Sequence, residues 1–178
     1  MITPLKNTST CCFLKLALFV LFISILPLFV SCSPDTLDVV ATENQTTTSH
    51  LILFTRNVAM ENDLFERVNQ YRISLGKAPL ERNTDADNQA SEHTIYMVEK
   101  NNINHDFLQQ RTAFFLNLGF VSLKENVASG YTNAQTLLDA WLQSESHRFA
   151  IEADGVATGI SVLKNEAGIQ FITQIYLK

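Results

Sequence analysis

The chain has 178 residues, of which 46% are hydrophobic and 10% aromatic, and its formal net charge is −5 at pH 7. This amount of apolar material suffices for one hydrophobic core but not for two, so we expect a single folded domain. The acidic balance and the lack of a basic cluster disfavour nucleic-acid binding, because such binding needs many Lys and Arg side chains against the phosphates.

The N-terminal segment has the pattern of an export signal. Residues 16–30 are almost wholly apolar, Lys6 and Lys15 precede this run, and no acidic residue occurs before Asp35. A helix that spans a membrane needs about 20 consecutive apolar residues, so this run is too short for one. Its length and its basic flank are typical of a signal peptide.

The end of this segment resembles the bacterial lipobox, in which a cysteine thiol is acylated and the cysteine becomes the new N-terminus. Ser31 stands directly before Cys32, although Phe29 occupies a position where that motif usually has leucine. We therefore predict a lipoprotein-type signal peptide over residues 1–31 and lipidation of Cys32, with an uncleaved anchor or ordinary signal cleavage as alternatives. The protein would be exported and held at the membrane of the cell envelope, or secreted.

Residues 32–57 are predicted to form a flexible tether, because they are rich in small polar residues and cannot bury enough apolar area to offset chain entropy. All three cysteines precede the domain that we predict over residues 58–178, so this domain has no disulfide and depends on its core. Loss of residues 1–31 would leave 11 basic and 18 acidic side chains, a formal charge of −7. Membrane association would then depend on the lipid at Cys32.

Two helices open the predicted domain. Apolar residues recur at helical spacing over residues 62–75, and Gly76 stands where a left-handed C-terminal cap is typical. A second helix is predicted from a cap at Asn83 or Thr84 to about Lys100, since acidic residues fill its first turn.

Two further helices flank a short extended segment. Asp106 is the predicted cap of a third helix that Gly119 ends. The extended segment covers residues 123–129, and Thr132 with Gln135 has the spacing of a capping box for the fourth helix.

The C-terminal segment has the pattern of a β-hairpin. Residues 156–163 and 169–176 are rich in β-branched residues and alternate in polarity, and a polar turn at residues 164–168 separates them. Helices followed by antiparallel strands predict an α+β fold, with helices packed against a small sheet.

Three polar residues at the ends of predicted elements could carry chemistry. His105 lies in the break between the second and third helices, Glu125 lies in the extended segment, and His147 follows a predicted helix end. Taken singly, each is better explained by a structural role such as capping or ion pairing. Spacing alone does not assemble them into a site.

Four stretches between residues 61 and 178 have an order and spacing typical of one family. They read VNQYRISLGKAPLERN, DNQASEHTIYMVEKNNINH, KENVASGYTNAQTLLDAWLQSESHR and VATGISVLKNEAGIQFITQIYL. With these motifs the chain resembles the CAP superfamily (cysteine-rich secretory, antigen 5 and pathogenesis-related 1 proteins) in its compact bacterial form. The resemblance implies an α-β-α sandwich with a mostly antiparallel sheet.

The resemblance also implies a surface cleft in which two histidines and acidic residues converge. Carried over position by position, the predicted binding cleft contains His105, Glu125 and His147. In eukaryotic members a further acid stands three residues after a tryptophan, but here Ser144 holds that place and Glu145 follows it. One residue on a helix is a rotation of about 100°, so we include Glu145 as a fourth candidate that can point elsewhere.

Two roles are consistent with such a cluster. His105 and His147, together with a carboxylate, could bind Zn²⁺ or another divalent cation and leave one coordination position open. Alternatively, the carboxylates orient the imidazoles in a polar pocket that binds its ligand without a metal. The resemblance establishes no cofactor, since some members of the family hold a divalent ion in this cleft and none is obligatory for the group.

We expect a binding module rather than an enzyme. The domain contains no HExxH motif, no cysteine and no GxSxG motif. The expected partner is a small-molecule or envelope-derived ligand, and the alternative function is a metal-dependent hydrolase that acts on envelope or extracellular substrates. His93, on the second helix, is expected to be a packed or solvent-facing residue and not a ligand.

Overall fold

The computed structural model describes residues 54–178. The predicted signal peptide, Cys32 and the tether up to residue 53 lie outside the described residues. The helices are α1 (Val58–Ser74), α2 (Thr84–Lys100), α3 (Leu108–Asn117), α4 (Ala134–Gln143) and α5 (Glu145–Glu152). The strands are β1 (Phe54–Arg56), β2 (Glu81–Arg82), β3 (Leu123–Ser129), β4 (Ala157–Asn165) and β5 (Gln170–Leu177).

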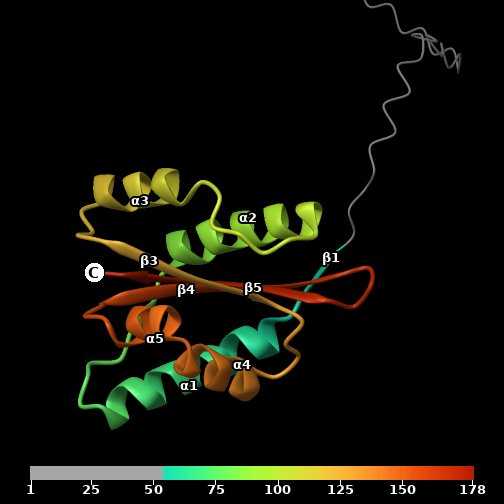
Figure 1. Ribbon diagram of the computed structural model, residues 1–178. Helices are drawn as coiled ribbons and strands as arrows, with labels where there is room; N and C mark the ends of the chain where they lie inside the picture. The colour runs from blue at the N-terminus through green and yellow to red at the C-terminus, as the bar shows by residue number, and fades with distance from the viewer. Residues whose placement is uncertain (1–53) are drawn as a thin grey trace, which may run out of the picture. The chain divides into compact units, whose positions relative to one another are not determined.

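The strands form one sheet with helices on both faces. Figure 1 shows α2 and α3 on one face and α1, α4 and α5 on the other. The strand order is β1-β4-β5-β3, and β2 pairs with β4 in parallel beside this path. The predicted α+β fold, with helices packed on a mostly antiparallel sheet, is confirmed.

The predicted hairpin and extended segment are both strands of this sheet. β4 pairs antiparallel with β5, with Ala157 opposite Leu177 and Lys164 opposite Gln170. β3 covers the predicted residues 123–129 and pairs antiparallel with β5, at the end of the strand order. Among residues 54–178, no strand pairs with the other long edge of β3.

Asparagine caps set the beginnings of three helices. Asn83 caps α2 as predicted, through an oxygen that accepts a hydrogen bond from the N–H of Ala86. Asn57 caps α1 in the same way, so this helix begins four residues before the predicted start at residue 62. The predicted capping box at Thr132 is wrong, because Asn133 is the cap of α4.

The beginning of α3 also differs from the prediction. Asp106 is not its cap, because the carboxylate of Asp106 accepts a hydrogen bond from the hydroxyl of Tyr96 at 2.8 Å. Phe107 is the N-cap residue instead, with a left-handed φ of 61° and no side-chain capping bond. A left-handed backbone is uncommon for a residue that carries a Cβ.

The larger core lies between the sheet and the α1, α4 and α5 layer. Leu64, Trp141 and Ile151 pack there against Ile160 and Ile172 of the sheet, and all five are buried. Burial of this apolar area supplies most of the driving force for folding.

On the opposite face α2 lies very close to β4. The contact is made at Gly159, where an added Cβ would overlap the backbone of Ala86 and Asp87. The carboxylate of Asp87 also accepts a hydrogen bond from the N–H of Ile160 at 2.8 Å. This approach fixes α2, and with it the loop that carries His105, relative to the sheet.

Three elements were missed by the sequence analysis, namely α5, β1 and the two-residue strand β2. α5 follows α4 after a single residue, Ser144, which serves both as the C-cap of α4 and as the N-cap of α5. β1 lies in residues that the sequence analysis placed in the tether, and it pairs with β4. Within residues 54–178 no helix combines the length and the apolar character needed to cross a bilayer.

Candidate functional site

The site is organised by two neighbouring residues on β3. Successive side chains on a strand point to opposite faces of the sheet, so Glu125 and Asn126 face different helical layers. Glu125 meets residues of α2, α3 and the loop between them, whereas Asn126 donates a hydrogen bond to the carbonyl of His147 in α5 at 3.1 Å. The edge strand therefore joins the two halves of the site.

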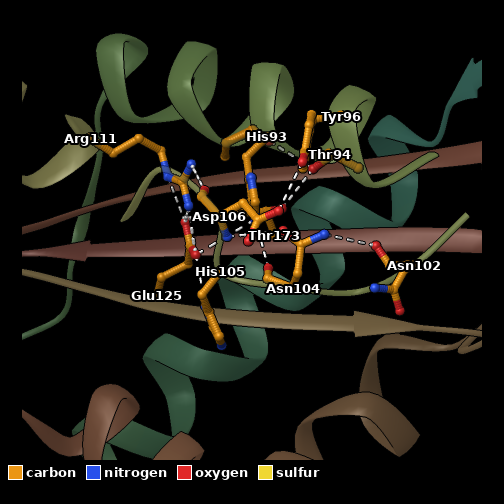
Figure 2. A network of polar contacts seen from close by, with 11 residues as sticks. His93, Thr94, Tyr96, Asn102, Asn104, His105, Asp106, Arg111, Glu125 and Thr173 are labelled. Carbon is orange, nitrogen blue, oxygen red and sulfur yellow. Dashed lines mark hydrogen bonds and ion pairs between the residues drawn. The ribbon is translucent and has the colours of Figure 1, made fainter. Parts of the chain in front are cut away.

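Glu125 is held by Arg111 of α3. The Nε of Arg111 donates to Oε2 of Glu125 at 2.8 Å and its Nη2 donates to Oε1 at 2.9 Å, as Figure 2 shows. The side chain of Glu125 is fully buried and that of Arg111 is 6% exposed. Bidentate contacts of this kind are strong and geometrically specific, so the pair fixes the orientation of the Glu125 carboxylate.

His105 is oriented by the same carboxylate. Its Nδ1 lies 2.8 Å from Oε1 of Glu125. An ionised carboxylate only accepts hydrogen bonds, so Nδ1 carries the proton and, in the neutral ring, Nε2 keeps its lone pair. The side chain is 46% exposed, and His105 therefore presents a fixed hydrogen-bond acceptor to solvent.

Of the two placements expected for His93, packed or solvent-facing, the structure shows the packed one. Its Nε2 lies 2.8 Å from the carbonyl of Asn104, to which it donates, and 3.7 Å from Oε1 of Glu125. Burial lowers the pKa of His93, and Arg111 and His105 act in the same direction, while Glu125 and the Asn104 carbonyl oppose this. The ring is therefore favoured in its neutral form. Figure 2 shows His93 together with Glu125 and Arg111 in one polar network.

His147, the other predicted histidine, lies on α5 in the opposite helical layer. Its ring stacks on Trp141 with a centroid distance of 6.2 Å and an interplanar angle of 25°. Burial lowers the pKa of His147, and the electrostatic influence of His105 lowers it further.

Ser144 takes the place of an orienting acid beside His147. Its Oγ lies 2.8 Å from Nδ1 of His147. A hydroxyl can donate or accept, so it permits either tautomer of a neutral ring, in contrast to the carboxylate that fixes His105. His147 can thus offer either an N–H or a lone pair at Nε2.

Glu145 lies elsewhere. Its side chain is exposed and lines a different hollow of about 700 Å³, together with Arg148, Phe149 and Glu152. Glu145 and His147 are two residues apart on α5, a rotation of about 200° around the helix. The structure brings His105 and Glu125 into contact but does not bring Glu145 to them.

The residues present do not form a closed metal site. In the part of the chain that the structure describes, no three His, Cys, Asp or Glu side chains are placed so that they could hold a metal ion. The oxygens of Glu125 already accept from Arg111 and His105, which leaves two imidazoles as the donor set. A tetrahedral zinc site usually takes at least three protein ligands. The predicted metal at His105 and His147 stays a prediction.

Residues 65–176 match the cysteine-rich secretory protein (CAP) family. The chain belongs to this family. Among solved structures, the CAP-type domain is similar to an outer surface protein from Borrelia burgdorferi, with a TM-score of 0.64 and 22% identity over 71% of this chain and 98% of that protein. The fold assignment from the sequence is thereby confirmed.

Two other solved structures share the CAP fold. One is a cysteine-rich secretory protein from Staphylococcus aureus, with a TM-score of 0.59 and 21% identity. The other is an extracellular protein containing an SCP domain from Bacillus anthracis, with a TM-score of 0.60 and 23% identity. Each match covers 68% of this chain but only 38% and 41% of those two proteins. Comparison with curated proteins gave no match.

Sequence reasoning missed Arg111 and the role of Ser144. Arg111 stands in the predicted third helix between Gln110 and Thr112, and an arginine in such a polar stretch usually extends into solvent. Its distance from Glu125 along the chain, 14 residues, gives no local pairing signal. The useful signal would have been the buried Glu125 itself, since a buried carboxylate requires a partner.

Proposed function

We propose that this CAP protein is an exported binding module, lipid-anchored at Cys32, whose cleft binds a small hydroxyl-bearing ligand between His105 and His147. The observation that carries the proposal is the contact of His105 with the buried Arg111–Glu125 pair. It turns an exposed imidazole into an acceptor of fixed direction. Preorganised polar groups of this kind are typical of ligand sites.

The charge of the cleft favours a neutral ligand over an ion. Arg111 and Glu125 neutralise each other, and the lowered pKa of His147 keeps its ring uncharged near neutral pH. An alcohol group both donates and accepts, so it complements an acceptor at His105 and either tautomer of His147. The hydroxyl-bearing building blocks of a bacterial envelope are ligands of this class.

A nuclear magnetic resonance titration tests the cleft. We expect an N-acetylated amino sugar or glycerol, offered as probes, to shift the imidazole signals of His105 and His147. The double variant His105→Ala/His147→Ala should lose at least about tenfold in affinity, because a site built to hydrogen-bond a hydroxyl loses both partners. Glu145→Ala, the matched control on the same helix, should keep the affinity because its side chain lines the other hollow.

The outcomes separate the proposal from its alternatives. If neither probe shifts the two imidazoles, or if the double variant binds as well as the parent chain, the proposed cleft is wrong. Repeating the titration with ZnCl₂ and with a chelator tests the predicted metal. Release of a cleaved product from an ester or amide probe, abolished by the chelator and by the double variant, would favour the hydrolase instead.

Export and anchoring are tested separately. The names of two similar structures describe an outer surface protein and an extracellular protein, which supports export of this chain as well. When the full sequence is expressed in a bacterium, we expect it in the membrane fraction and labelled by a fatty-acid analogue. Cys32→Ser should lose the label, whereas Cys12→Ser should keep it. Equal labelling of both variants would refute lipidation at Cys32.

A further inference from the structure

A second hollow lies between α2 and α3, behind the Arg111–Glu125 pair. It has a volume of about 420 Å³. One wall comes from α2, from Gln89 to Tyr96, and the other from Phe107 and α3 as far as Phe114. In both walls the lining residues recur at i, i+3, i+4 and i+7, so each helix turns one continuous face toward the hollow. We call it the α2–α3 groove.

Aromatic rings are left uncovered at the rim of this groove. Phe107 is 53% exposed and Phe114 is 40% exposed. The ring of Phe107 contacts that of Tyr96 edge to face at 5.3 Å. Phe107 is also held in the left-handed region, at φ 61°, where a side chain is disfavoured. The chain thus keeps a strained backbone at a position that presents an apolar ring to solvent.

Most polar side chains of the α2–α3 groove already have a hydrogen-bond partner, although the buried Nδ1 of His93 has none. Gln89 donates to Glu92 at 2.8 Å, and the hydroxyl of Tyr96 donates to Asp106 at 2.8 Å. Arg111 is paired with Glu125, and the Nε2 of His93 donates to a backbone carbonyl. The cation that lines the groove, Arg111, is already paired, and the carboxylate of Glu92 lies at the exposed rim. An anionic ligand would therefore lose hydration there without gaining a cationic partner.

We infer that the α2–α3 groove binds a neutral aromatic small molecule, whose ring packs against Phe107 and Phe114. The size of the groove suits a molecule of one or two rings, and the aromatic rim supplies the offset or edge-to-face contacts that such rings prefer. The inference goes beyond the proposed function, because the ligand, the lining and the chemistry differ from those of the His105–His147 cleft.

Photolabelling with benzophenone tests this inference on the chain purified from cells that express the full sequence. Benzophenone is neutral and has two rings, and on illumination it inserts into nearby C–H bonds, so mass spectrometry identifies the labelled peptides. We expect the main adducts on the peptides that contain residues 89–96 and 107–114. The charged analogue 4-benzoylbenzoate should label them at least about fivefold less.

Variants identify the site. Phe107→Ala/Phe114→Ala should lower this labelling at least about fivefold, and Gln110→Trp, which fills the groove from an exposed position, should do the same. Phe149→Ala is the matched control, because Phe149 is 63% exposed but lines the other hollow. Circular dichroism confirms that each variant is folded. Adducts spread over the surface, equal labelling by the charged analogue, or an equal loss in Phe149→Ala would overturn the inference.

Discussion

Replacing Arg111 with methionine is expected to destabilise the domain by about 3–5 kcal/mol, because it leaves the carboxylate of Glu125 buried without its cationic partner. Glu125 is fully buried, and its remaining ion-pair contacts are to histidines, of which His93 is favoured neutral by burial. Urea unfolding followed by circular dichroism measures the change in the free energy of unfolding.

A second substitution distinguishes loss of the partner from loss of packing. In Arg111→Met/Glu125→Met both charges are absent, so this double variant should be more stable than Arg111→Met alone. Arg67→Met is the matched control, because Arg67 pairs with Asp63 on the surface of α1 with 34% and 40% of the two side chains exposed. Exposed pairs contribute at most about 1 kcal/mol. A cost below about 1 kcal/mol for Arg111→Met would show that Glu125 does not depend on it.

Replacing Gly159 with alanine is the second change with a large expected effect. The added Cβ would overlap the backbone of Ala86 and Asp87, so α2 would have to move off β4. Backbone atoms cannot move aside as a flexible side chain can, so the overlap is not relieved locally. We therefore expect a loss of at least about 3 kcal/mol in the free energy of unfolding. Because α2 carries His93 and leads into His105, the site should lose its order as well.

Ser161→Ala provides the control for this second change. Ser161 lies two residues further along β4, on the same face, and its buried hydroxyl lacks a hydrogen-bond partner. Because this hydroxyl has no partner to lose, its removal should leave the free energy of unfolding unchanged or raise it slightly. Urea unfolding of the two variants side by side gives the comparison, and a Gly159→Ala protein as stable as Ser161→Ala would show that the helix is not tightly seated.

Much of the fold could be predicted because its periodicity is local. The extended segment predicted over residues 123–129 has the bounds of β3, and Asn83, one of two predicted caps, begins α2. α5 was missed because a single residue, Ser144, separates it from α4, and no break signals a second helix. β1 was missed because three residues beside a polar segment carry too little pattern to be told from a tether.

The site was predictable in part. His105 and Glu125 came from the resemblance, and the structure places them in contact. Arg111 could not be found in this way, because the partner of a buried carboxylate is decided by tertiary packing and not by its position along the chain. The face that a residue of α5 presents also depends on where that helix begins, which is why Glu145 was hard to place.

The alternation of Glu125 and Asn126 on the edge strand has a consequence for how this sequence can change. Adding one residue between α3 and β3 would bring Lys124 to the position that faces Arg111 and Glu125 to the position that faces the backbone of α5. Deleting one residue would bring the amide of Asn126 to face Arg111 instead. The length of that connection is thus constrained by charge as much as by space. Insertions compatible with the site would have to add an even number of residues, so that each side chain of β3 still points to the same face of the sheet.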